Sequence, residues 1–208
     1  LACAPMSADQ LAWFGSVSAF ALAMAATPGP NNAMVAASGA RFGILRTLPH
    51  VLGITLGFPL MVLAVAIGAG QFLLANPWLH AVLRWIGAAY LLWLAWTIAR
   101  PHPAAAPDGN TSRQPLGLLP AALFQWVNPK AWIIAVGAVV TYTGQNAPIG
   151  QTLAMAAVFG LVTLPAVLFW TAVGAGAASV LRTERALRRF DLAMAALLVA
   201  SLLPIVFE

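Results

Sequence analysis

Charged residues and cysteines are scarce in this chain. Only 7% of its 208 residues are charged, whereas a soluble domain normally carries about 25%, so water is not the main solvent of the folded chain. Cys3 is the single cysteine, which excludes a disulfide framework, a CxxC redox pair and a thiolate metal site. We therefore expect no metal site and no cofactor.

Apolar stretches long enough to cross a bilayer recur along the whole chain. Hydrophobic residues make up 62% of the sequence, and a membrane helix needs about 20 predominantly apolar residues in succession. Six spans are predicted, at roughly 9–43, 47–70, 78–99, 116–142, 149–181 and 187–207. They leave almost nothing for a soluble module, so we expect a single all-α integral membrane domain over residues 1–208. Met6 is a more natural start than the preceding LACAP.

The basic residues gather in alternate loops. They are Arg41, Arg46, Arg100, Arg113, Arg182, Arg185, Arg188 and Arg189, whereas the loops 71–77 and 143–148 carry no charge. This alternation is the positive-inside signature of membrane proteins. It predicts that the basic loops face the cytoplasm and that the C-terminus lies outside. The net charge of +5 is therefore a sign of topology and does not indicate a nucleic-acid partner.

Two of the predicted spans are interrupted by proline near their middles. The first break reads Thr27-Pro28-Gly29-Pro30-Asn31-Asn32, and the second reads Asn128-Pro129-Lys130. Proline frees backbone carbonyls that hydrocarbon cannot satisfy, so such breaks belong inside protein or beside a polar cavity. Paired breaks in corresponding positions indicate the central binding site of a transporter. We interpret these nine residues as a substrate site, the alternative being two simple proline kinks.

Each break also has the residues that start a new helix. Asn128 is a good N-cap, and Pro30 and Pro129 suit a first helical position. A helix N-terminus attracts a carboxylate, while the carbonyls of 25–27 that end the preceding helix suit an ammonium group. Together these ends complement a zwitterionic amino acid.

Lys130 is the most informative single residue. A cation near the middle of a membrane span costs roughly 2.5 kcal/mol or more unless it has a partner or water. We interpret Lys130 as the partner of a substrate carboxylate; the alternative is that it bonds the carbonyls freed near Pro129, or snorkels to the interface.

Two further residues are candidates with weaker support. Arg84, six residues into span three, either contacts substrate or snorkels to the interface. His50, at the start of span two, titrates near neutral pH and is a candidate for proton coupling, the alternative being a hydrogen-bonded interfacial histidine. The acidic residues all read as terminal or loop positions: Asp9, Asp108, Glu184, Asp191 and Glu208. A cationic substrate would need a buried carboxylate, so its absence favours neutral amino acids.

Proline and glycine recur at nearly constant offsets in the two halves. Pro30 and Pro129 are 99 residues apart, and Gly68 and Gly174 are 106 apart. With three spans in each half, the second half must enter the membrane from the opposite side. This predicts an inverted 3+3 repeat, with repeat one at about 9–99, a cytoplasmic linker at about 100–115 and repeat two at about 116–208. Coincidence in a chain rich in alanine, glycine and proline is the alternative.

Four motifs resemble the LysE/RhtB family of bacterial amino-acid exporters: TPGPNN at 27–32, LPHVLGITLGF at 48–58, IGAAYLLWLAW at 86–96 and FQWVNPKAW at 124–132. GAAYLLWLAW is most like the branch of cysteine and O-acetylserine exporters. The resemblance implies a multi-pass protein of the cytoplasmic membrane that exports amino acids by secondary transport, driven by the proton-motive force. The family's PGPNN and NPK motifs fall on 28–32 and 128–130. Its basic-amino-acid exporters tend to carry an acidic residue after the first motif, and this chain has none there.

Neutral amino-acid export by alternating access is thus the leading interpretation, of homoserine/threonine, leucine or cysteine/O-acetylserine type. The expected partners are an amino-acid substrate and the lipid bilayer, and a homo-oligomer is compatible with the sequence. One alternative is a carrier of another small solute or a metal ion. Another is a membrane-embedded enzyme or assembly factor, for which Ser38 and His50 are conceivable members of a catalytic site, although no recognisable motif surrounds them.

Overall fold

A computed structural model describes residues 6–100, 114–143, 147–181 and 183–203. The described residues form helices and connections, with no strand among them. The predicted linker lies mostly outside these ranges, as do Cys3, Asp108, Arg113, Arg182 and Glu208. The helices are α1 (Ala8–Ala26), α2 (Pro30–Ala64), α3 (Gly70–Leu74), α4 (Pro77–Ala99), α5 (Leu118–Phe124), α6 (Pro129–Tyr142), α7 (Ile149–Val180) and α8 (Glu184–Ala200), with a π-helical turn at Val65–Ala69 and a 3₁₀ turn at Gln125–Val127.

Both predicted breaks interrupt helices, and a proline explains each. Thr27 precedes Pro28 and has ψ of 127°, while Asn128 precedes Pro129 and has ψ of 108°. Gly29, before Pro30, is also extended. Steric conflict with the proline ring disfavours the helical region for the preceding residue, so the chain leaves the helix at each of these positions and restarts at the proline.

A glycine makes the corner between the two arms of α2. Gly43 has φ of 75° and ψ of 173°, a left-handed conformation that residues with a side chain rarely adopt. Helix resumes directly on either side of it. The sequence predicts a short loop between spans one and two, and the structure has this single-residue corner instead.

Three helical segments are long and apolar enough to cross a membrane: Pro30–Leu73, Pro77–Ala99 and Ile149–Val180. The pair Leu118–Val127 and Pro129–Tyr142, bent by 72°, makes a fourth if it is taken as one broken span. These counts refer to the described residues. The chain is thus an all-helical, multi-pass membrane protein, and the remaining two of the six predicted spans stay predictions.

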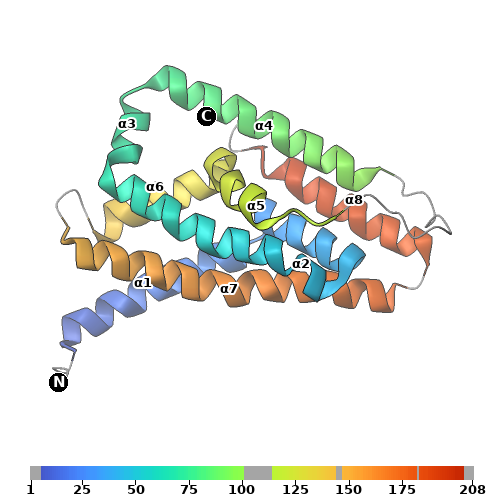
Figure 1. The fold of residues 1–208 in the computed structure, drawn as a ribbon, viewed down its shortest axis with the longest axis horizontal. Helices are drawn as coiled ribbons and strands as arrows, with labels where there is room; N and C mark the ends of the chain where they lie inside the picture. Colours follow the sequence, from blue (N-terminus) through green and yellow to red (C-terminus); the bar gives the residue numbers. More distant parts are fainter. Residues whose placement is uncertain (1–5, 101–113, 144–146, 182, 204–208) are drawn as a thin grey trace.

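The long helices α2 and α7 pack along each other, and α4 packs against α8 (Figure 1). Glycines permit the close approach of α2 and α7. A Cβ on Gly39 would overlap the carbonyl of Thr171, and one on Gly174 would overlap the carbonyl of Ala36. Small residues at helix contacts are typical of membrane proteins, where packing drives association.

Gly53 and Gly57 permit a similar close approach in the second arm of α2. A Cβ on Gly53 would overlap the carbonyl of Leu118, and one on Gly57 would lie 2.6 Å from the Cα atom of Ala122. α5 therefore lies directly on α2, which brings the end of α5 and the second break toward the first break.

Candidate functional site: a cavity between two helix breaks

A cavity of about 50 Å³ lies between the two breaks. One water needs roughly 10–15 Å³ on this measure, so the cavity has the capacity of a few water molecules. Its walls come from α1, α2, α6 and α7. The lining residues are Ala21, Met24, Ala25, Gly29, Pro30, Asn31, Asn32, Ile54, Phe58, Asn128, Lys130, Ala131, Ile134, Phe159, Thr163 and Val167. Six of the nine predicted site residues are among them; Thr27, Pro28 and Pro129 are adjacent in the chain.

Asn32 holds the end of α1. Its side-chain amide donates to the carbonyl of Ala25 at 2.9 Å and to the carbonyl of Thr27 at 3.0 Å. These two carbonyls lie at the C-terminal end of α1, where the helix stops and its last carbonyls have no amide partner within the helix. The sequence assigns them to a substrate ammonium group, but the chain itself already satisfies them.

Lys130 spans the gap between the two breaks. Its Nζ donates to the carbonyl of Thr27 at 2.7 Å, with the carbonyl of Pro28 at 3.5 Å. The backbone at Gly29 lies beside the lysine stem, since a Cβ there would be 2.9 Å from Cδ and 3.0 Å from Nζ of Lys130. Lys130 therefore bonds carbonyls of the first break, rather than those near Pro129, and it also lines the cavity; its binding of a substrate carboxylate stays a prediction.

A reciprocal amide pair joins the breaks a second time. Asn31 Nδ2 donates to Gln125 Oε1 at 2.9 Å, and Gln125 Nε2 donates to Asn31 Oδ1 at 3.3 Å. Gln125 is fully buried and also donates to the carbonyl of Ala121 at 3.0 Å. Sequence reasoning missed Gln125. Its position inside the motif FQWVNPKAW, three residues before Asn128, is the signal that could have pointed to it.

The two restarted helices differ in how their N-termini are capped. At α6 the side chain of Asn128 accepts a hydrogen bond from the backbone amide of Lys130 at 3.2 Å, as predicted for an N-cap. At α2 the cap residue is Gly29, which provides no side-chain hydrogen bond. The N-terminus of α2 is thus the one that leaves its amides and its partial positive charge for a ligand.

The opposite end of the cavity is apolar. Ile54 and Phe58 of α2, Ile134 of α6, and Phe159 and Val167 of α7 form its walls. The rings of Phe58 and Phe159 meet edge to face, with centroids 5.3 Å apart and an interplanar angle of 79°. The cavity therefore has one polar end at the breaks and one end suited to an uncharged group.

His50 and Arg84 do not line the cavity. His50 lies one helical turn from Ile54 on α2 and is 1% exposed, so it is buried within the protein. Its Nδ1 is 3.5 Å from the hydroxyl of Ser38, across the Gly43 corner. Nε2 of His50 and Nε of Arg84 are buried and find no hydrogen-bond partner among the described residues.

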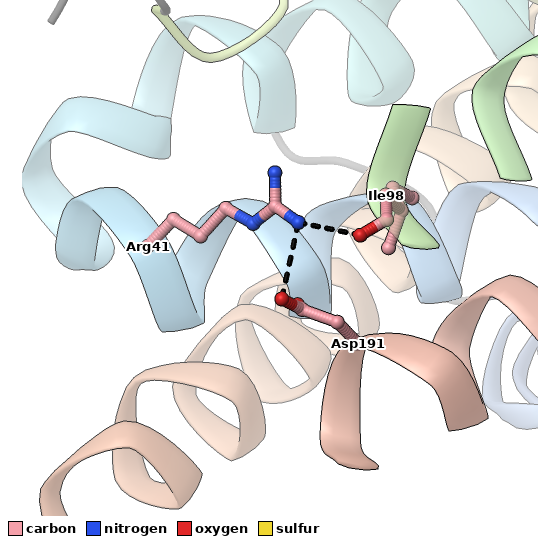
Figure 2. Close-up of polar contacts among 3 residues, drawn as sticks. All are labelled: Arg41, Ile98 and Asp191. Atoms are coloured by element: carbon pink, nitrogen blue, oxygen red, sulfur yellow. Dashed lines mark hydrogen bonds and ion pairs between the residues drawn. The ribbon is translucent and has the colours of Figure 1, made fainter. Parts of the chain in front are cut away.

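Asp191 does not lie in a loop, contrary to the sequence prediction. It lies inside α8 and pairs with Arg41 of α2, with 3.1 Å between Oδ2 and Nη2 (Figure 2). The same Nη2 donates to the carbonyl of Ile98, near the end of α4, at 2.8 Å. The ion pair itself could not be foreseen, because its two partners are 150 residues apart in the sequence. Asp191 does not line the cavity.

The sequence matches known proteins over most of its length. The model of the LysE type translocator family matches residues 22–203. Three relatives are each named cysteine/O-acetylserine efflux protein. The one from Klebsiella pneumoniae subsp. pneumoniae is 36% identical over 59% of this chain and 61% of its own length, so the match spans less than two thirds of that relative.

The other two relatives match over a larger share. The protein from Salmonella typhimurium is 34% identical over 72% of each chain, and the protein from Escherichia coli O1:K1 is 30% identical over 72% of each chain. No solved structure matches. Because the family model covers the two breaks, the cavity and all the helices from α2 to α8, this chain belongs to the LysE-type translocator family.

Proposed function

We propose that this chain exports small neutral amino acids or their derivatives across the bacterial cytoplasmic membrane by secondary active transport. Its relatives are named as efflux proteins for cysteine and O-acetylserine, and its family is one of translocators, so transport is expected rather than catalysis. The observation that carries the proposal is the cavity between the two breaks, with Lys130 and the uncapped start of α2 at its polar end.

The polar end suits the two charges of an amino acid. The substrate carboxylate would bind the N-terminal amides of α2 and the ammonium of Lys130, which together supply oriented donors and positive charge. The substrate ammonium would bind the side-chain oxygens of Asn31 and Asn128, which both line the cavity. Each of these oxygens accepts one bond in the structure and has a second lone pair.

The charges of the cavity favour a neutral substrate. Lys130 is the one charged side chain among the described residues that line it. A lysine or arginine substrate would bring a second cation, which a site in low dielectric binds only with a buried carboxylate. Asp191, a partly buried carboxylate of α8, is engaged by Arg41 and does not line the cavity.

Alternating access requires two halves that rock about the substrate, and we propose that these are the two inverted repeats. Corresponding contacts support this. The second arm of α2 packs on α5, while α7 packs on α1, as expected if α1 corresponds to α5 and α2 to α7.

Proton coupling is assigned to His50 in this proposal. It is the titratable side chain buried one helical turn from the cavity wall at Ile54. A histidine can carry the proton of an exchange near neutral pH. Arg84 does not line the cavity, so the structural role is the one proposed for it in α4.

The proposed orientation places the basic loops in the cytoplasm and the C-terminus outside. A pair of reporters, alkaline phosphatase and green fluorescent protein, fused in turn after Glu208 should give phosphatase activity and no fluorescence. The opposite pattern would overturn the orientation. The same fusions inserted in the linker at 101–113 are the matched control and should give the reverse result.

The proposed export is tested by profiling amino acids in the growth medium. Cells loaded with a mixture of dipeptides would express the intact protein, the Lys130→Met variant or an empty vector, with membrane levels checked by immunoblot. A few small neutral amino acids should accumulate outside only with the intact protein. An identical medium in all three cultures, with the protein present in the membrane, would refute the proposal.

A further inference from the structure

One hydroxyl interrupts the apolar end of the cavity. Phe159, Thr163 and Val167 follow one another at intervals of four along α7, so they share one face of that helix. All three line the cavity together with Ile54 and Phe58 of α2. Thr163 is the polar member of this wall, and only 7% of it is exposed.

The hydroxyl of Thr163 is not used by the helix. Five threonines in helices or at helix ends donate to the carbonyl four residues earlier: Thr27, Thr47, Thr97, Thr143 and Thr171. Thr163 makes no hydrogen bond with any residue that the structure describes. The buried polar atoms that lack a partner do not include Oγ1 of Thr163, so this hydroxyl is open to the cavity that Thr163 lines and can bond a ligand there.

We expect the charged groups of the substrate to bind at one end of the cavity and its side chain at the other. If the carboxylate and ammonium bind at the breaks, the part of the cavity left for the side chain includes the wall formed by Phe58, Phe159 and Thr163. The space is small, and the two aromatic rings in edge contact bound it. A short side chain fits there, and a group on it that donates or accepts a hydrogen bond meets Thr163.

We propose that Thr163 is the specificity-determining residue of this cavity. It selects short amino-acid side chains that carry one uncharged hydrogen-bonding group, such as a hydroxyl, thiol or ester, over aliphatic side chains of the same size. Unpaired polar groups are the basis of such discrimination, since an analogue that lacks the group leaves the hydroxyl buried without a partner. The inference rests on the proposed function and goes on to name the substrate class.

The test compares two substrates of nearly equal size that differ in this group. Purified protein in proteoliposomes would exchange L-serine or L-2-aminobutyrate, which has a methyl group in place of the hydroxyl. The intact protein should prefer serine in apparent KM. Thr163→Val, which keeps the shape, should reduce that preference by about two- to tenfold, the equivalent of one neutral hydrogen bond, whereas Thr163→Ser should keep it.

Thr171→Val is the matched control. Thr171 lies two turns further along α7, is fully buried and donates to the carbonyl of Val167, so its loss should not change the ratio of the two substrates. An unchanged ratio in Thr163→Val, or an equal loss of both substrates, would overturn the role of Thr163 while leaving amino-acid transport intact as a function. Failure of the unaltered protein to transport either substrate would refute the proposed function, and this inference with it.

Discussion

Lys130→Met removes the one cation from the cavity and keeps an unbranched side chain in its place. Lys130 is the only lysine of the chain, and its Nζ lies at the first break, 2.7 Å from the carbonyl of Thr27. If a substrate carboxylate binds beside it, the variant loses a charge-assisted hydrogen bond. If Lys130 serves only to hold the break together, the variant loses stability and keeps its affinity for substrate.

The effects of Lys130→Met on substrate affinity and on stability are expected to differ in size. Hydrogen bonds to charged groups are worth about 1.5–3 kcal/mol, and about 1.4 kcal/mol corresponds to a tenfold change, so the apparent KM should rise about 10- to 150-fold. The stability change should be smaller, because the hydrogen bond lost to the carbonyl of Thr27 is offset by removal of a partly buried cation. The carbonyl of Thr27 keeps its hydrogen bond from Asn32 at 3.0 Å, and it is therefore not left unsatisfied.

The assay is substrate counterflow in proteoliposomes, with initial rates measured over a range of amino-acid concentrations and the melting temperature measured on the same preparations. Arg46→Met is the matched control, because Arg46 is exposed and its loss changes the net charge equally. It should leave KM unchanged. A Lys130→Met protein with normal KM and a large drop in melting temperature would refute the assignment of Lys130 to the substrate.

Three other changes test separate elements of the account. Pro30→Ala should slow transport by letting helix continue through Gly29, which Pro30 now holds extended; initial rates measure this, and normal kinetics would contradict the broken-helix mechanism. Arg41→Gln should lower the free energy of unfolding by about 1–3 kcal/mol, between the values for exposed and buried ion pairs, and Asp191→Asn in the same chain should recover some of it in thermal melts. Full additivity of the two changes would mean that the pair is not coupled. His50→Gln should abolish accumulation driven by a pH gradient and spare counterflow; gradient-driven transport at the normal rate would remove His50 from proton coupling.

Local stereochemistry made the breaks predictable. Each break residue precedes a proline, and the restriction that a proline places on its neighbour acts within the same two residues. The N-cap role of Asn128 is equally local, since its bond reaches only the amide of Lys130. The family could be identified from the same segments because TPGPNN and QWVNPK are short, contiguous motifs.

Contacts between distant segments were not predictable from one sequence. Asn31 and Gln125 are 94 residues apart, and Lys130 and Thr27 are 103 apart, so nothing local indicates that they meet. The same holds for Thr163, which reads as one threonine in an apolar helix until the structure places it on the cavity wall. Asp191 was expected in a loop, and the structure places it inside α8, paired with Arg41.

The number of membrane spans could not be predicted from composition alone. Apolar length predicts six, but α8 carries five charged side chains within its first eight residues: Glu184, Arg185, Arg188, Arg189 and Asp191. The part of α8 that follows these charges, 192–200, is far shorter than the roughly 20 apolar residues that cross a bilayer. α1 has 19 residues and includes Asp9, Gln10 and Ser16, which lower its hydropathy in the same way.

The most direct test of the account is efflux from proteoliposomes that contain only the purified protein. Vesicles loaded with a mixture of labelled neutral and basic amino acids would be diluted into medium with an imposed pH gradient, and the released compounds identified by mass spectrometry. The account predicts release of small neutral amino acids with polar side chains, reduced strongly in Lys130→Met, and retention of lysine and arginine. Release of the basic amino acids in preference, or no release beyond protein-free vesicles, would contradict it.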